Sequence, residues 1–208
     1  MQSQLVYKEA YVSNKTDSKK QLIIDKATEI FAQKGFRDVT MKDIVLACEI
    51  SRGGLYLYYD STEGIFLDVI RAQEEEEEET GKSMIDKLRE ASSAELLLWF
   101  LKEQKKEILK RKNSLSVAIY EYAFFCRQEL HNSNIKQRFE ASVTVLTKIL
   151  ERGSETGEFL CDDPKGMASN MMYAIEGMKI CARTMGISES KVDKELIYMM
   201  RQFMEVED

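Results

Sequence analysis

The sequence has little of what short strands and tight hairpins require. Its 208 residues include 10 glycines and a single proline, Pro164, whereas β-rich chains turn repeatedly through short hairpins built from such residues. The hydrophobic content of 44% and the aromatic content of 9% are typical of a folded globular protein rather than a disordered chain. We therefore predict an all-α fold.

Long apolar runs are also missing. The longest stretch without a charged residue is Gly166–Ile175, whereas a membrane-spanning helix needs about 20 apolar residues. The first residues, Met1 to Asn14, lack the apolar core and the small-residue cleavage site of an export signal. These absences predict a cytoplasmic protein without a membrane partner.

Residues for metal binding or catalysis are sparse. The four cysteines, at positions 48, 126, 161 and 181, form no C-x-x-C pair, and the single histidine, His131, has no second ligand arranged as a site. The sequence contains no recognisable Ser/His/Asp arrangement and no glycine-rich phosphate loop. We therefore predict reduced, buried thiols, no metal or other cofactor, and no enzymatic activity.

Charge is distributed unevenly along the chain. The formal net charge of −6 argues by itself against a polyanionic partner. Residues 1–60 nevertheless carry nine Lys or Arg against eight Asp or Glu, so the acidic excess lies in residues 61–208. We expect this distribution if only a small part of the surface meets phosphate.

Helical spacing and capping residues divide the chain into two parts. Residues 1–62 are predicted to hold three short helices, which begin at Asp17 or Ser18, at a weak Thr40-x-x-Asp43 capping box, and at Ser51. Residues 63–208 are predicted to form a helical bundle. Its expected helices run from Ser61 into Glu74–Glu79 and over Ser93–Lys112, Ser114–Arg127, Ser133–Thr156, Pro164–Met185 and Glu189–Val206.

The third short helix, about residues 51–58, has an unusual content. Each of its two adjacent glycines destabilises a helix by about 1 kcal/mol relative to alanine, so neighbouring elements must hold it. Tyr56, Tyr58 and Tyr59 cannot all point inward at about 100° per residue, and at least one must be exposed. Three short helices followed by a long one are typical of a helix-turn-helix unit, whose recognition helix enters the major groove of DNA.

These residues carry a family resemblance from Ile23 to Phe66. This stretch resembles the N-terminal DNA-binding domain of TetR-family (tetracycline-repressor-like) transcriptional regulators. The motifs are Ala27…Ile30-Phe31-x-x-x-Gly35-Phe36, Thr40-Met41-x-Asp43-Ile44 and Ser51-Arg52-Gly53-x-Leu55-Tyr56-x-Tyr58-Tyr59.

The resemblance implies a homodimeric regulator, a repressor rather than an activator, that binds a pseudo-palindromic double-stranded DNA operator. A small apolar or aromatic inducer would release it. The competing hypothesis is a helical protein-interaction adaptor or ligand carrier that keeps the fold without operator binding.

The predicted DNA interface lies in the second and third helices. Leu57 could contact a thymine methyl or simply pack against the protein. The predicted DNA-binding residues are Thr40, Lys42, Ser51, Arg52, Gly53, Gly54, Tyr56, Leu57 and Tyr58, and the expected small core comprises Phe31, Ile44, Ile50, Leu55 and Tyr59.

Three positions depart from the family pattern. Glu49 stands where the family usually has the glycine of the turn, so the turn must take another conformation or a strained one. Gly54 replaces a hydroxyl residue, and Thr62 replaces a usual lysine, which removes one phosphate contact. These departures motivate the adaptor hypothesis.

Residues of the second part suggest a ligand pocket and a dimer interface, although the pocket residues equally describe a plain helical core. The pocket prediction comprises Trp99, Phe100, Tyr120, Tyr122, Phe125, Met171 and Tyr173. Each of the last two helices has one apolar seam at helical spacing, which predicts a four-helix interface between two copies. The seam residues are Met167, Met171, Met178, Met185, Val192, Leu196, Met199 and Phe203.

Overall fold

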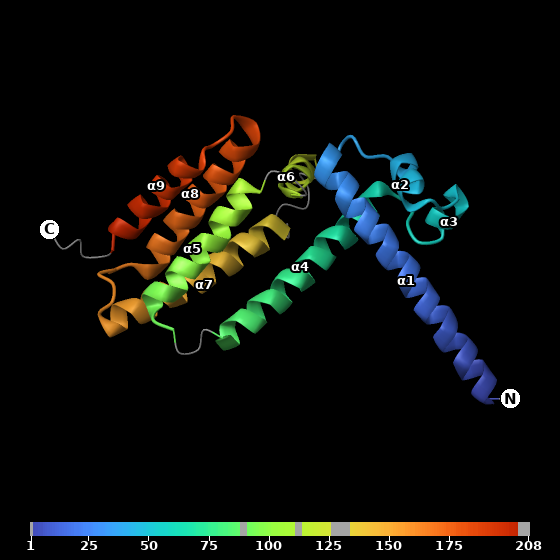
Figure 1. The fold of residues 1–208 in the computed structure, drawn as a ribbon, viewed down its shortest axis with the longest axis horizontal. Coiled ribbons are helices and arrows are strands. Elements are labelled where there is room, and N and C mark those ends of the chain that lie inside the picture. Colours follow the sequence, from blue (N-terminus) through green and yellow to red (C-terminus); the bar gives the residue numbers. More distant parts are fainter. Residues whose placement is uncertain (1, 88–90, 111–113, 126–133, 204–208) are drawn as a thin grey trace. The chain divides into compact units, whose positions relative to one another are not determined.

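The computed structural model describes residues 2–87, 91–110, 114–125 and 134–203, and within these ranges the regular elements are all α-helices (Figure 1). Side chains are described for residues 18–76, 91–110, 114–125 and 135–203. The helices are α1 (Gln2–Lys34), α2 (Met41–Cys48), α3 (Arg52–Tyr56), α4 (Thr62–Lys87), α5 (Ser93–Leu109), α6 (Ser116–Phe125), α7 (Asn134–Thr156), α8 (Pro164–Thr184) and α9 (Glu189–Arg201). The predicted all-α fold is confirmed, and within the described ranges no helix combines the length and apolarity needed to cross a membrane.

Most helix starts follow the predicted signals. Ser61 accepts a hydrogen bond from the Gly64 N–H at 3.1 Å before α4, and Pro164 occupies the first position of α8. The exception is α1, which begins at Gln2 rather than at Asp17 or Ser18. Residues 2–16 contain neither proline nor glycine, so nothing in the sequence stops the helix there.

The chain forms two compact units, and their boundary differs from the predicted one at residue 62. The first unit comprises residues 1–82 and 115–122, and the second comprises residues 83–114 and 123–208. The first turns of α4 bury Ile65, Phe66 and Val69 in the core of the first unit. The first unit therefore includes much of α4 and α6 as far as Tyr122.

Aromatic rings form the centre of the first unit. The Phe66 ring lies 4.8 Å from that of Phe31 and 5.0 Å from that of Phe36, centroid to centroid. Tyr122 of α6 packs against Phe36 at 4.9 Å, and its hydroxyl donates to Glu63 at 3.1 Å. This aromatic cluster fixes α1, α4 and α6 together beneath the shorter helices.

The second unit packs α5, α7, α8 and α9 around one apolar core. Glu158 accepts hydrogen bonds from the backbone N–H groups of Ala94 and Ser93, at 3.0 and 3.1 Å, at the start of α5. Both bonds hold the pKa of Glu158 below its usual value. At the other end of α5, Arg183 donates to the carbonyls of Glu107 and Ile108 at 3.2 and 3.3 Å. Side chains from neighbouring elements thus satisfy both ends of α5.

The apolar seams of α8 and α9 belong to this core, so most of the residues predicted for the dimer interface pack within the chain. Met167 is half-buried against the same core, and Met185 is 77% exposed. Apolar residues at helical spacing mark whichever face is buried, and here that face packs within the chain. The six buried seam residues are Met171, Met178, Val192, Leu196, Met199 and Phe203.

Candidate nucleic-acid interface

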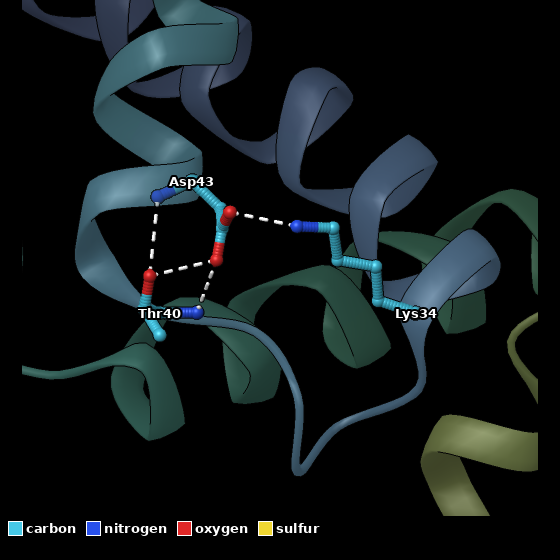
Figure 2. A network of polar contacts seen from close by, with 3 residues as sticks. All are labelled: Lys34, Thr40 and Asp43. Atoms are coloured by element: carbon cyan, nitrogen blue, oxygen red, sulfur yellow. Dashed lines mark hydrogen bonds and ion pairs between the residues drawn. The ribbon is translucent and has the colours of Figure 1, made fainter.

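A complete capping box starts α2 and ties it to α1 (Figure 2). The Thr40 hydroxyl accepts from the Asp43 N–H at 3.3 Å, and the Asp43 carboxylate accepts from the Thr40 N–H at 2.8 Å. Lys34, in the last turn of α1, donates to the same carboxylate at 2.7 Å. The Lys34 ammonium, followed by the Thr40 hydroxyl and N–H, lowers the pKa of Asp43 to about 2.

Of the two alternatives that Glu49 leaves for the turn between α2 and α3, another conformation or a strained one, the structure has the strained one. This residue has φ 54° and ψ 35°, in the left-handed region. Among the described residues it is the one non-glycine with positive φ. A side chain there is unfavourable because its Cβ crowds the following carbonyl oxygen. The geometry lets the Ile50 N–H donate to the Val45 carbonyl at 3.3 Å and so close the end of α2.

α3 is shorter than predicted and depends on its neighbours. It spans Arg52–Tyr56, and Ser51 caps it by accepting from the Gly54 N–H at 3.0 Å. Leu55 is fully buried in the core of the first unit. Because five residues with two glycines cannot persist as an isolated helix, the burial of Leu55 holds α3 in place.

The exposed side of α3 presents a cation, a phenol and an aliphatic group. The Arg52 guanidinium lies 5.6 Å from the centroid of the Tyr56 ring, a cation–π contact that positions both side chains. Tyr56 is 40% exposed and Leu57 is 83% exposed. This combination can meet base edges and phosphates at once.

The three tyrosines have different environments. Tyr56 is exposed, Tyr58 is half-buried, and Tyr59 is buried. The Tyr59 hydroxyl donates to Asp68 of α4 at 2.9 Å, and burial together with this bond raises the pKa of Tyr59. The expectation that at least one tyrosine is exposed is confirmed, and Tyr59 belongs to the core as predicted.

The nine predicted DNA-binding residues all lie between Thr40, the cap of α2, and Tyr58, two residues past the end of α3, and seven of them are exposed. Gly54 and Tyr58 are the two half-buried members. The predicted core residues Phe31, Ile44 and Leu55 are buried, whereas Ile50 is half-buried. The structure therefore brings the predicted interface residues together.

A small cleft beside α3 was not predicted. Its volume is about 220 Å³, and Leu22 and Lys19 of α1 line it together with Ile50, Leu57 and Tyr58. The neighbouring Lys20 instead pairs with Asp68 at 2.7 Å. The sequence signal that could have indicated this cleft is Leu22, which forms a run of three apolar residues with Ile23 and Ile24.

The seven predicted pocket residues are divided between the two units. Tyr120 and Tyr122 belong to the first unit, and Phe100 and Met171 are buried core of the second.

Trp99 lines an open groove of about 870 Å³, whose other walls are mainly lysine and glutamate side chains. Tyr173 is 69% exposed and packs against the Phe139 ring at 4.9 Å, and Phe125 is 67% exposed. His131 and Cys126 lie outside the described residues. Cys48 is buried, whereas Cys161 and Cys181 are partly exposed free thiols.

A helix-turn-helix with an exposed recognition helix, joined to a separate helical unit, defines a class of DNA-binding transcriptional regulators. Residues 23–69 match the family model described as bacterial regulatory proteins, tetR family, and residues 96–193 match that of a tetracyclin repressor-like C-terminal domain. The chain belongs to the tetR family of bacterial regulatory proteins. It is thus a DNA-binding regulator and not an enzyme.

Individual relatives agree with this assignment. The uncharacterized HTH-type transcriptional regulator YfiR of Bacillus subtilis (strain 168) is 30% identical over 149 residues, which cover 69% of each chain. The HTH-type transcriptional regulator QacR of Staphylococcus aureus is 21% identical over 188 residues, covering 90% of this chain and 95% of QacR.

Solved structures show the same fold. A TetR transcription regulator from Haloarcula marismortui superimposes with a TM-score of 0.76 at 16% identity, covering 91% of this chain and 100% of that one. A transcriptional regulator from Saccharomonospora viridis in complex with choline gives 0.74 at 16% identity, with the same coverage.

Proposed function

We propose that this regulator is a repressor, that it binds a pseudo-palindromic operator as a homodimer, and that a small apolar or aromatic inducer releases it. The observation that carries the proposal is the exposed face of α3, where Arg52, Tyr56 and Leu57 stand on a helix anchored from behind by Leu55. Arg52 can bond a guanine edge with two parallel N–H groups, and Tyr56 can donate to a phosphate.

A second copy is proposed to bind the outward faces of α8 and α9. On α8, Tyr173, Gly177 and Ile180 follow each other at intervals of four and three residues and therefore share one face. All three are exposed, and the described structure has no atom within 4 Å of where a Gly177 Cβ would stand. On α9, Ile197 and Tyr198 are 48% and 54% exposed. An apolar face with a small central residue suits close packing against another helix.

The proposed inducer site lies in the second unit. Three polar atoms of α5, Ser93 Oγ, Trp99 Nε1 and Gln104 Oε1, are buried without a hydrogen-bond partner in the described structure. Leaving such an atom unpaired is unfavourable by about 1–3 kcal/mol, so a ligand whose acceptor reached the Trp99 N–H, or whose donor reached the Gln104 carbonyl, would stabilise the unit. Met171 and Met172 of the adjoining core are flexible side chains that can repack around an apolar ligand. The choline complex of the Saccharomonospora viridis regulator supports small-molecule binding by this fold.

α6 is proposed to carry the inducer signal. Its residues up to Tyr122 belong to the first unit, and those from Ala123 belong to the second. In the first unit the Glu121 carboxylate accepts hydrogen bonds from the backbone N–H groups of Phe36 and Arg37, at 2.7 and 3.1 Å. A change in the second unit that moves α6 would therefore act directly on the loop between α1 and α2.

Selection from random DNA duplexes tests the proposal. Purified full-length protein is expected to enrich a motif with two-fold symmetry, and Arg52→Ala is expected to weaken binding of that motif by about 1–3 kcal/mol. Dimerisation should be unchanged in this variant because Arg52 is remote in sequence and function from α8 and α9. Recovery of unselected sequence at low salt would contradict the repressor and favour the adaptor that keeps the fold without operator binding.

A further inference from the structure

Leu57 occupies the outermost line of the recognition helix. Residues of an α-helix follow one another at about 100°, so Gly53 and Leu57, four residues apart, lie on nearly the same line. Each is two residues from the buried Leu55 along the chain, so both positions lie on the side of the helix opposite to Leu55. Leu57 keeps helical dihedrals, φ −70° and ψ −18°, at the end of α3. The line of Gly53 and Leu57 therefore faces away from the core of the first unit.

Leu57 does not pack against the protein. Its side chain is 83% exposed, more than any other large hydrophobic side chain that the structure describes. Beside it, Gly53 offers only backbone, with no described atom within 4 Å of the Cβ position. On one flank of this line stand Arg52 and Tyr56, and on the other lies the cleft that one edge of Leu57 lines together with Leu22, Ile50 and Tyr58. An aliphatic side chain thus projects beyond a bare stretch of helix backbone.

From this geometry we propose that Leu57 determines operator specificity by packing against the 5-methyl group of thymine in the major groove. The inference rests on the proposed operator binding and adds to it the chemical group that is recognised. A helix that enters the major groove presents its outermost line to the base edges. There the thymine methyl is the one apolar group that a base pair displays, so it is the natural partner of an isolated leucine.

Gly53 makes this contact possible. Without a Cβ at position 53, the backbone of α3 can approach the bases closely enough for the branched end of Leu57 to reach a methyl group. Arg52, on the neighbouring line, is then placed for a guanine edge or a phosphate. We therefore expect each operator half-site to contain a thymine whose methyl group contributes to affinity.

Replacement of thymine by deoxyuridine tests the proposal, because it removes the methyl group and keeps Watson–Crick pairing. In the duplex enriched by the full-length protein, each thymine is replaced singly and the dissociation constant is measured. We expect at least one half-site position at which the replacement weakens binding about fourfold, which corresponds to about 0.8 kcal/mol for one buried methyl-sized group. In Leu57→Ala the same replacement should have no effect.

Leu46→Ala provides the matched control. It shortens an equally apolar side chain, 66% exposed, on α2 instead of α3, and it should keep the sensitivity to deoxyuridine. An enriched duplex that tolerates every replacement, that lacks thymine in its half-sites, or that remains sensitive in Leu57→Ala overturns the role of Leu57 and leaves operator binding intact. Failure to enrich any duplex overturns the operator proposal and this inference with it.

Discussion

At the scale of single residues, the left-handed Glu49 is the clearest case of unfavourable local geometry. Its φ of 54° destabilises the folded state by about 1 kcal/mol relative to glycine, which adopts this region freely. We expect Glu49→Gly to raise the free energy of unfolding by about that amount, measured by urea denaturation. Glu29→Gly, at an exposed position inside α1, should lower it by about 1 kcal/mol. Changes of the same sign in both variants would contradict this explanation.

Asp43 predicts a pH dependence of stability. Its folded-state pKa of about 2 lies below the unfolded value of about 3.9, so the ionised carboxylate stabilises the folded state above pH 4. This stabilisation is lost as the pH falls from about 4 to about 2. Asp43→Asn should lower the free energy of unfolding by about 1 kcal/mol at neutral pH, because it removes the carboxylate from the capping box.

Urea denaturation of the parent and of Asp43→Asn between pH 7 and pH 2 measures the difference in their free energies of unfolding. This difference should shrink toward zero between pH 4 and pH 2. Asp38→Asn changes an exposed carboxylate of the preceding loop and should stay within about 0.5 kcal/mol of the parent at neutral pH. A constant difference between Asp43→Asn and the parent at all pH values would rule out the ion pair with Lys34 as its cause.

At the scale of elements, Gly53 makes α3 less stable than an alanine would, and it also leaves the helix backbone open to approach by DNA. Because the space at Gly53 is open, Gly53→Ala should raise the free energy of unfolding by about 0.5–1 kcal/mol. The same methyl group lies on the outermost line of α3, so we expect weaker operator binding. Urea denaturation and operator titration of one variant measure the two effects.

Gly54→Ala is the matched control for the effects of Gly53→Ala on stability and on operator binding. Its Cβ would lie 3.1 Å from the Ser51 hydroxyl that caps α3, so it should gain less stability than Gly53→Ala. A Gly53→Ala protein that binds the operator as tightly as the parent would show that α3 docks on another face.

The elements that could be predicted from the sequence are those with local signals. The capping groups of Thr40, Ser51 and Ser61 lie within three residues of their partners, so the sequence contains the whole interaction. The placement of α6 could not be predicted, because its contact joins Glu121 to Phe36, 85 residues apart. Periodicity identified the buried faces of α8 and α9, but it cannot tell whether a face packs within the chain or against a second copy.

The predicted DNA interface differs from the other predicted sites in being local. Its residues fall in one contiguous segment, so the motif contains all of them. The pocket prediction drew residues from α5, α6 and α8, and no local pattern shows which side of each helix faces the others. Tyr122 illustrates this, since its ring and hydroxyl are both used within the first unit.

At the scale of the whole molecule, operator specificity requires two copies. One α3, about 7.5 Å long at 1.5 Å per residue, spans little more than two base pairs at about 3.4 Å each. Two copies related by a two-fold axis double the number of contacts and match a pseudo-palindromic site. If the proposed dimer forms through the outward face of α8, that face is as important for operator binding as α3.

A charged residue on the outward face of α8 should prevent two copies of the chain from forming the proposed dimer. Ile180→Glu places a carboxylate in the proposed apolar interface, where an unpaired charge is strongly unfavourable. Sedimentation velocity should show monomers at concentrations where the parent is dimeric, and operator affinity should fall by at least about tenfold because each copy then binds its half-site alone. The matched control is Val145→Glu on α7, since Val145 is 44% and Ile180 45% exposed. Dimers that persist in Ile180→Glu, or that are lost equally in Val145→Glu, would place the interface elsewhere in the second unit.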